Sequence, residues 1–286
     1  MQIVTAHPKK FKCGRFCLDL FDRTNVMGIL NRTPDSFSDG GFFLDLETAF
    51  NHVKQMVADG SDIIDIGGES TRPGAVPVTL LEEMDRTIPL IEKISQNLNI
   101  PISIDTSKHE VAKEAIRAGS AMVNDVTGLK RDPLMAKTIA SSDAAVCLMH
   151  MRGTPRDMQD NPKYDDLMIE VINSLRESID IAVGAGISRD KIIVDPGIGF
   201  GKTVQHNLTI IKEIARLKVL AAPILIGVSK KAFIGEILDK NVDERLMGSI
   251  SASLFAASGG ANIVRVHDVK EMAEAVRMHD AIQGVG

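Results

Sequence analysis

The sequence predicts an α/β protein, a (β/α)8 TIM barrel in which all 286 residues form one domain. Eight short apolar runs alternate with segments whose apolar residues recur three and four positions apart, as in amphipathic helices. Each run ends in polar residues, as expected where the carboxyl ends of parallel strands converge on one mouth. An open doubly wound sheet would not need polar chemistry at every strand end, so we prefer the barrel.

Each apolar run is assigned to a strand because it is short and is followed by residues that interrupt the hydrogen bonding between strands. The clearest case is Ile63, Ile64 and Ile66, followed by GGESTRPG at 67–74. In chain order the predicted strands are 26–30, 63–66, 100–104, 121–123, 144–149, 192–194, 224–228 and 261–264. The predicted helices are 45–59, 79–97, 108–117, 165–185, 204–217, 247–258 and 269–282, with a further helix beginning near Lys231.

Three local features complete the predicted architecture. Residues 1–22 are an N-terminal extension in which a short hairpin at 11–20, turning at CGR, closes the floor of the barrel. Ser107 is the predicted N-cap of the helix at 108–117. His150 has no carboxylate nearby in the sequence and is predicted to be a buried structural residue.

Composition narrows the class of protein. The net charge is −5 and no basic stripe is present, which argues against a nucleic-acid partner. The start of the chain has no apolar signal core and no run approaches membrane-spanning length, so no membrane association is expected. The three cysteines are too few and wrongly spaced for a disulfide framework or a structural zinc site, which favours a cytoplasmic location.

One group of strand ends carries carboxylates and an amide, namely Asp105, Asn124 and Asp195. Such groups must meet hydrogen-bond donors, because an unpaired buried charge is costly. They suit a flat heterocycle with a donor-rich edge, such as a 2-amino-4-oxo pyrimidine, which a carboxylate can bind at two points. Lys231 would donate to a carbonyl or nitrogen of the same ring.

A second group of residues suits anions. Arginine binds phosphate or carboxylate oxygens through two parallel hydrogen bonds, and histidine and hydroxyl groups add further donors. The group comprises Arg72, Arg265, His267, Ser70 and Thr71. Asn31 offers a hard oxygen ligand, and Mg2+ that is bound mainly by a diphosphate takes only one or two protein ligands. The inferred ligand is therefore a heterocycle with a diphosphate, together with Mg2+.

With these residues in view, the chain resembles the dihydropteroate synthases of the pterin-binding barrel family. The resemblance extends from about residue 27 to residue 279. It rests on MGILNRTPDSFSDGG at 27–41, DIGGESTRPG at 65–74, SIDTS at 103–107, CLMHM at 147–151, DPGIGFGK at 195–202, GVSKK at 227–231 and RVH at 265–267. Seven motifs in the right order are far more specific than a single glycine pattern.

The resemblance implies a transferase of an alkyl group, here dihydropterinylmethyl. The amine of p-aminobenzoate would displace pyrophosphate from 6-hydroxymethyl-7,8-dihydropterin diphosphate, giving 7,8-dihydropteroate for folate biosynthesis. It also implies sulfonamides as competitors at the p-aminobenzoate end and a homodimer. The apolar helices 247–258 and 269–282 could form the interface, or the same residues could pack on the barrel.

The resemblance also assigns roles to individual positions. Pterin binding falls to Asp105, Asn124, Asp195 and Lys231, with Met149 and Phe200 as apolar walls. Pyrophosphate binding falls to Asn31, Arg72, Arg265 and His267, with Asn31 also the Mg2+ ligand. p-Aminobenzoate binding falls to Thr71, Arg72, Pro73 and Ser229.

We hypothesise a dissociative, SN1-like mechanism, because an electron-rich dihydropterin can stabilise a carbocation at its exocyclic methylene. The catalytic residues would be Arg265, His267 and Lys231, together with Asp35. Asp35 would stabilise the developing positive charge and help to close the site, although its place at a helix opening offers a second explanation for the acid.

Two alternatives and two departures from the family pattern stay open at this point. A pterin-dependent methyltransferase would have no diphosphate to bind, and a catalytically silent pterin-binding protein would be expected to lack the anion-binding residues. Arg32 replaces a small apolar residue and is expected to point to solvent. Lys230 replaces an arginine, which keeps the charge but loses the planar guanidinium that can form two parallel hydrogen bonds.

Overall fold

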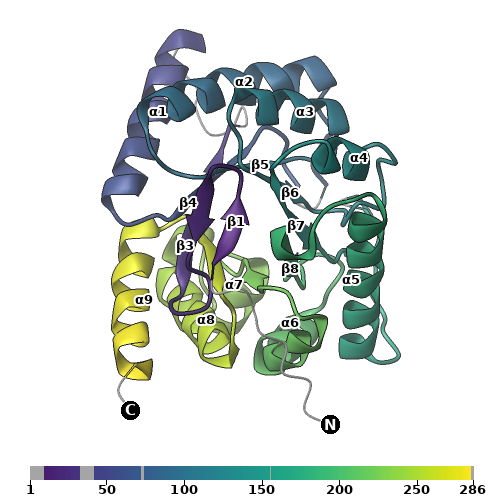
Figure 1. The fold of residues 1–286 in the computed structure, drawn as a ribbon. Helices are drawn as coiled ribbons and strands as arrows, with labels where there is room; N and C mark the ends of the chain where they lie inside the picture. The colour runs from purple at the N-terminus through teal and green to yellow at the C-terminus, as the bar shows by residue number, and fades with distance from the viewer. Residues whose placement is uncertain (1–9, 33–41, 72–73, 155, 285–286) are drawn as a thin grey trace.

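The computed structural model describes residues 10–32, 42–71, 74–154 and 156–284 (Figure 1). Within these residues eight parallel strands form one sheet in the order β8-β7-β6-β5-β4-β3-β10-β9. The strands are β3 (Asn25–Asn31), β4 (Ile63–Gly67), β5 (Ile102–Asp105), β6 (Met122–Asp125), β7 (Ala145–Met149), β8 (Ile192–Asp195), β9 (Leu225–Ile226) and β10 (Ile263–Val266). A parallel bridge between Val194 and Ile224 joins the two ends of the sheet. The sheet is thus a closed barrel, as predicted.

Helices surround the strands on the outside of the barrel (Figure 1). They are α1 (Phe42–Ala58), α2 (Leu80–Asn97), α3 (His109–Ala118), α4 (Met135–Ala140), α5 (Leu167–Gly184), α6 (Val204–Lys212), α7 (Ala232–Leu238), α8 (Leu246–Gly259) and α9 (Val269–Gln283). Three 3-10 helices also occur in the described residues, η2 (Arg189–Lys191), η3 (Ile214–Leu220) and η4 (Val242–Glu244). The six residues of α4 are too few for a periodic signal, and the sequence did not predict that helix.

The predicted single helix at 204–217 is wrong, because α6 ends at Lys212 and η3 follows it. The buried side chains of η3 are Ile214, Leu217 and Leu220, which are three residues apart. A 3-10 helix has three residues per turn, so this geometry keeps all of them on the core side.

The barrel floor is closed by the N-terminal hairpin, as predicted. Strands β1 (Phe11–Cys13) and β2 (Phe16–Leu18) are antiparallel, and Gly14 turns between them with a positive φ of 55°. Phe11, Cys13 and the nearby Leu20 are buried against residues near the amino ends of the barrel strands. The hairpin therefore covers the end of the barrel opposite the mouth.

The predicted cap of α3 is wrong. Lys108, not Ser107, is the N-cap residue, and its side chain makes no capping hydrogen bond. The backbone N–H of His109 instead donates to Oδ2 of Asp132 at 2.9 Å. The acceptor comes from the loop after β6, so a neighbouring βα unit satisfies the first turn of this helix.

No helix among the described residues is both long and apolar enough to cross a membrane.

Candidate active site

Strand register brings the predicted heterocycle-binding residues together at the mouth. Asn31 of β3 pairs with Gly67 of β4, Gly67 with Asp105 of β5, and Asp105 with Asn124 of β6. Met149 of β7 pairs with Asp195 of β8 in the same way. Polar side chains from adjoining strands therefore stand side by side, because parallel strands end at one face of the barrel.

Arg265 of β10 lies across this row and links Asp105 of β5 to Asp65, which lies two positions before Gly67 in β4. Its Nε donates to Oδ2 of Asp65 at 2.6 Å and its Nη2 donates to Oδ2 of Asp105 at 2.8 Å. The amide of Asn124 also donates to Oδ2 of Asp65, at 3.3 Å. Burial and the neighbouring carboxylate Asp65 raise the pKa of Asp105 to about 7, although Arg265 opposes that shift.

Asp65 is the site residue that sequence reasoning missed. Its side chain is fully buried inside β4, where it accepts from both Arg265 and Asn124. The available signal was a carboxylate within a run of buried isoleucines, since such a charge needs a partner of opposite sign. That partner lies 200 positions away in the sequence.

Asp195, Lys231 and Phe200 form the other half of the mouth. Oδ1 of Asp195 accepts from the backbone N–H of Gly197 at 2.7 Å, and burial raises the pKa of this carboxyl. Nζ of Lys231 lies 4.3 Å from the centroid of the Phe200 ring, which is a cation–π contact. Phe200 packs with Met149 in a small buried apolar cluster that also contains Val126 and Met158.

Ser229 and His267 lie together at the ends of β9 and β10. The backbone N–H of His267 donates to Oγ of Ser229 at 3.2 Å, and the ring Nδ1 lies 3.0 Å from the same oxygen. Burial, and then the charge of Arg265, lower the pKa of His267 to about 4, so the ring is neutral at pH 7. Lys230 pairs with Asp268 at 2.9 Å.

The loop after β4 is anchored at its base. Nζ of Lys108 binds Oε2 of Glu69 at 2.6 Å and also binds the fully buried carboxylate of Glu83 on α2. Thr71 follows this anchor and is half-buried. The remaining predicted residues of the two mouth loops, Asp35, Arg72 and Pro73, lie outside the described residues.

Arg32 does not point to solvent as expected. It is 3% exposed, and its Nη1 donates to the backbone carbonyl of Arg86 on α2 at 2.8 Å. Arg86 in turn donates to the carbonyl of Gly68 at 2.9 Å. Arg32 is therefore part of the support for the loop after β4, because a guanidinium with carbonyl acceptors can be buried.

Comparison with known proteins agrees with this geometry. The family described as pterin binding enzyme matches residues 27–267. A dihydropteroate synthase from Synechocystis sp. is 47% identical, covering 98% of this chain and 98% of its own length. The chain belongs to the dihydropteroate synthase family.

Two solved structures of dihydropteroate synthases have the same fold. The Yersinia pestis enzyme, in a complex with a sulfonamide drug, has a TM-score of 0.91 at 41% identity, covering 96% of this chain and 100% of its own. The Xanthomonas albilineans enzyme, with 4-aminobenzoic acid, has a TM-score of 0.91 at 42% identity, covering 97% and 99%. Likeness of this degree confirms the TIM barrel and the family resemblance.

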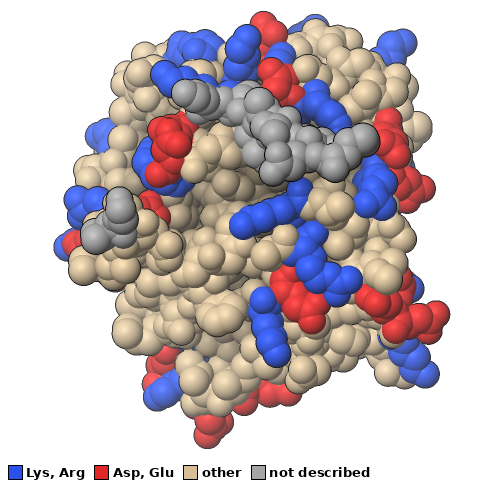
Figure 2. All heavy atoms as spheres, turned by 60° about the horizontal axis from the view of Figure 1, so that its bottom comes forward, with Lys and Arg blue, Asp and Glu red and all other residues tan. Residues whose placement is uncertain are grey.

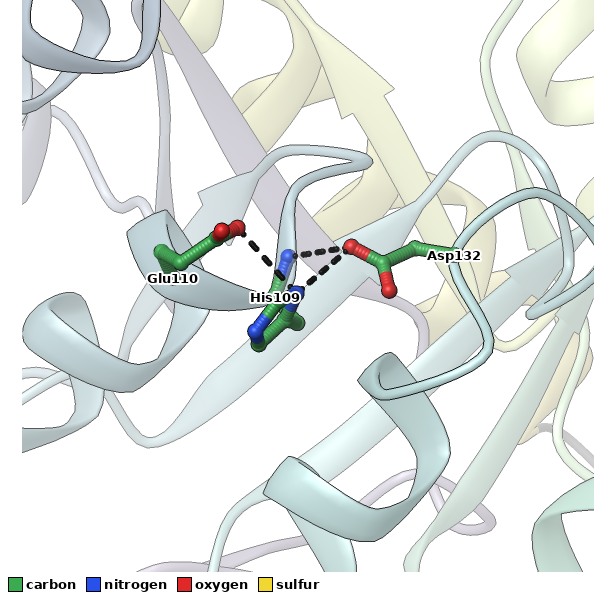
Figure 3. Close-up of side chains that lie close together, drawn as sticks. All are labelled: His109, Glu110 and Asp132. Carbon is green, nitrogen blue, oxygen red and sulfur yellow. Dashed lines mark hydrogen bonds and ion pairs between the residues drawn. The ribbon is translucent and has the colours of Figure 1, made fainter.

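Among the described residues, one cluster outside the predicted site has the side chains of a metal site (Figure 3). Nδ1 of His109 lies 2.8 Å from Oδ2 of Asp132 and 3.1 Å from Oε2 of Glu110. Burial is outweighed by hydrogen bonds from the backbone of His109 and Leu134, so the pKa of Asp132 is lowered. The carboxylate thus already caps α3, which accounts for the cluster without a metal.

A groove of about 560 Å³ lies far from the mouth, between the hairpin and helices α2 and α3. Its lining includes Arg15, Phe16, Ser95 and Arg117. These residues belong to the floor of the barrel, so the groove is separate from the predicted substrate site.

His150, at the end of β7, is buried as predicted, and this gives a pH dependence. Burial, and then the nearby Lys202, lower the pKa of His150 to about 2. A depressed folded-state pKa contributes stability above the unfolded value of about 6.5, and that stability is lost as the pH falls. Between pH 7 and pH 5 the unfolded chain takes up a proton that folded His150 does not.

The free energy of unfolding of the unchanged protein should fall between pH 7 and pH 5 because of His150. In His150→Gln, which lacks this proton uptake, we expect that fall to be smaller by about 2 kcal/mol. Urea unfolding at the two pH values measures this difference. The control is His52→Gln, because His52 is exposed on α1. Equal losses in the His150 variant and the unchanged protein would contradict the prediction.

Proposed function

We propose that this chain catalyses the reaction of the dihydropteroate synthases, in which p-aminobenzoate displaces pyrophosphate from 6-hydroxymethyl-7,8-dihydropterin diphosphate. The observation that carries the proposal is the row of carboxylate, amide and arginine side chains around Arg265. One mouth thus combines acceptors for a donor-rich ring with a cation, Arg265, for a diphosphate. A methyltransferase has no diphosphate that would use this arginine.

The pterin ring would bind between the apolar walls and the polar groups of β5, β6 and β8. Asp195 and Asn124 would meet its N–H and amino groups, and Lys231 would donate to its carbonyl or ring nitrogen. Met149 and Phe200 would cover its faces, and both are less than a tenth exposed. Asp105 completes the set, held in place by Arg265.

Asn31, Arg265 and His267 would hold the diphosphate, with Arg72 from the loop after β4. Oδ1 of Asn31 lies beside Gly67, where a Cβ on that glycine would be 3.3 Å away. The absence of a side chain at Gly67 leaves room around this amide oxygen. A single neutral oxygen of this kind fits Mg2+ that is carried mainly by a diphosphate. When bound, Mg2+ would neutralise part of the charge on the departing pyrophosphate.

His267 is neutral in the free protein and carries one ring N–H, which would donate to the diphosphate. An approaching diphosphate favours the protonated ring, so binding and protonation of His267 would support each other. Arg265 would stabilise the charge that develops on the leaving group. Asp35 would stabilise the carbocation and Lys231 would hold the ring as C–O cleavage proceeds, which is the dissociative course.

The p-aminobenzoate end would be formed by Thr71, Arg72, Pro73 and Ser229. Oγ of Ser229 lies 3.0 Å from Nδ1 of His267, so the p-aminobenzoate end would adjoin the diphosphate end. Sulfonamides would compete here, because they present a similar aniline and a polar group. The free thiols of Cys13, Cys17 and Cys147 accord with a reducing, cytoplasmic location.

The proposed function is tested by measuring pyrophosphate release with dihydropterin diphosphate and Mg2+, with and without p-aminobenzoate. We expect rapid release that requires p-aminobenzoate, with dihydropteroate formed in equal amount. Slow release without p-aminobenzoate would support the dissociative course. Binding of the pterin without release under either condition would overturn the proposal in favour of a silent pterin-binding protein.

We further propose that the chain is a homodimer that pairs through α7, α8 and α9. Helix α8 packs between the other two. Large apolar side chains are exposed along these helices, namely Ile237, Met247, Phe255, Met278 and Ile282. Figure 2 brings the lower side of Figure 1 forward and shows a broad area without charged side chains there. Exposed apolar patches of this kind mark association surfaces.

We expect Phe255→Glu to convert the dimer into a monomer, because a buried unpaired carboxylate in the interface is costly. Sedimentation velocity measures the change, and circular dichroism checks the fold. The matched control is Ile169→Glu on α5, where a similar exposed residue lies on another helix. A monomer in the unchanged protein would contradict the proposed dimer.

A further inference from the structure

Lys202 is a buried lysine at the end of the loop after β8, with 3% of its surface exposed. Its Nζ lies 2.9 Å from the carbonyl oxygen of Phe200 and 2.9 Å from Nδ1 of His150. The carbonyl oxygen of His150 is 3.5 Å away. The ammonium has three N–H donors, so its contacts join the loop after β8 to the end of β7.

Three successive carbonyls of this loop each accept from a side chain. The Gly199 carbonyl accepts from Nε2 of Gln159 at 2.6 Å, and the Gly201 carbonyl accepts from the Tyr164 hydroxyl at 2.9 Å. The Phe200 carbonyl between them accepts from Lys202. The first two donors come from the segment after β7, and Lys202 is tied to the start of that segment through His150. All three side chains therefore hold the loop after β8 against the segment that follows β7.

The same loop carries the proposed pterin contacts. It begins at Asp195, includes Phe200 and touches Lys231, since a Cβ at Gly199 would lie 3.3 Å from Cδ of Lys231. The fit to β7 is close, because a Cβ at Gly197 would lie 1.9 Å from the carbonyl oxygen of His150. A shift of this loop would displace a pterin wall and disturb the groups around it.

Burying a lysine is unfavourable, because its ammonium group loses contact with water. Burial lowers the pKa of Lys202 to about 7, although the charge of Asp195 opposes the shift. An apolar side chain would fill the same volume without that penalty. The contribution that only the lysine makes is its set of hydrogen bonds, which order the backbone around Phe200.

We propose that Lys202 is a positioning residue for the pterin end of the site. It holds the carbonyl of Phe200 against His150 and so keeps Phe200 and Asp195 in the arrangement that binds the ring. This inference rests on the proposed function, because it assigns the ring to these residues. It predicts a defect confined to one of the two substrates.

The test compares KM for dihydropterin diphosphate with KM for p-aminobenzoate in Lys202→Met. Hydrogen bonds to charged groups are strong enough that their loss should raise the pterin KM about tenfold or more. The p-aminobenzoate KM should stay within about twofold. Lys202→Gln keeps N–H donors, although one bond closer to the backbone, and should recover part of the pterin affinity. The control is Lys212→Met, because Lys212 is exposed on the helix that follows the same loop.

Tyr164→Phe is the second variant, in case Lys202→Met does not fold. It removes one hydrogen bond to the same loop and leaves the ring in place, so a smaller rise in the pterin KM is expected. Lower thermal stability with both KM values unchanged would reduce Lys202 to a structural residue and overturn the proposal. An equal rise in both KM values would also overturn it.

Calorimetric binding of dihydropterin diphosphate to the same proteins separates the two proposals. If the unchanged protein binds the pterin but releases no pyrophosphate, the proposed function fails. The dissociation constants of the Lys202 variants still decide whether Lys202 positions the pterin site.

Discussion

Replacing Arg265 with methionine is expected to produce the largest loss of both activity and stability. The substitution leaves Asp65, which is fully buried, and Asp105 without their shared cation. Removing one partner of a buried ion pair destabilises proteins by about 3–5 kcal/mol, since the remaining charge is uncompensated. The leaving diphosphate would also lose its proposed cation, which we expect to lower kcat/KM by at least about 100-fold.

Urea unfolding and pyrophosphate release measure the two effects of Arg265→Met. Arg265→Lys should recover more stability than activity, because lysine keeps the charge but cannot bind two carboxylates with a planar fork. Arg216→Met is the matched control, since Arg216 forms an exposed pair with Glu213. Such a pair contributes about 0–1 kcal/mol. Unchanged stability in Arg265→Met would contradict the role given to the buried network.

Replacing Asp195 with asparagine is expected to separate activity from stability. The amide keeps the shape and can still accept from the Gly197 N–H, but it cannot bind two ring donors with a negative charge. We expect the KM for dihydropterin diphosphate to rise about 100-fold, since charged hydrogen bonds contribute about 1.5–3 kcal/mol. The KM for p-aminobenzoate should change little.

The stability of Asp195→Asn should be unchanged or higher at pH 7. Burial raises the folded-state pKa of Asp195, so this group stabilises the protein at low pH and loses that contribution as the pH rises. A neutral amide has no such loss. Thermal unfolding at pH 7 tests this, with Asp143→Asn as the control because that side chain is 92% exposed. Unaltered pterin KM would exclude Asp195 from the pterin site.

Much of the barrel could be predicted from local patterns. The run at 63–66 became β4 and the run at 192–194 became β8, because a strand buried on both faces is continuously apolar. Polar residues at the strand ends then placed Asp105, Asn124 and Asp195 at one mouth, since closed parallel barrels have their carboxyl ends on one side.

Errors arose where a side chain depends on a distant partner. Ser107 had the local sequence of a helix cap, but Asp132 from the next loop occupies that role. Arg32 is expected to face solvent from its sequence, but the Arg86 carbonyl on α2 accepts from its buried guanidinium. Neither partner is marked by spacing along the chain.

By itself, the sequence determined the fold class, the order of the strands along the chain and the positions of Asp105, Asn124 and Asp195 at strand ends. These depend on hydrophobic period and on residue type at strand ends, which are local properties. The tertiary structure alone decided the partners, such as Arg265 with Asp65 and Lys202 with His150. Strand register and the closure of the barrel bring these residues together, and the distances that set hydrogen bonds and pKa values exist only once the chain is folded.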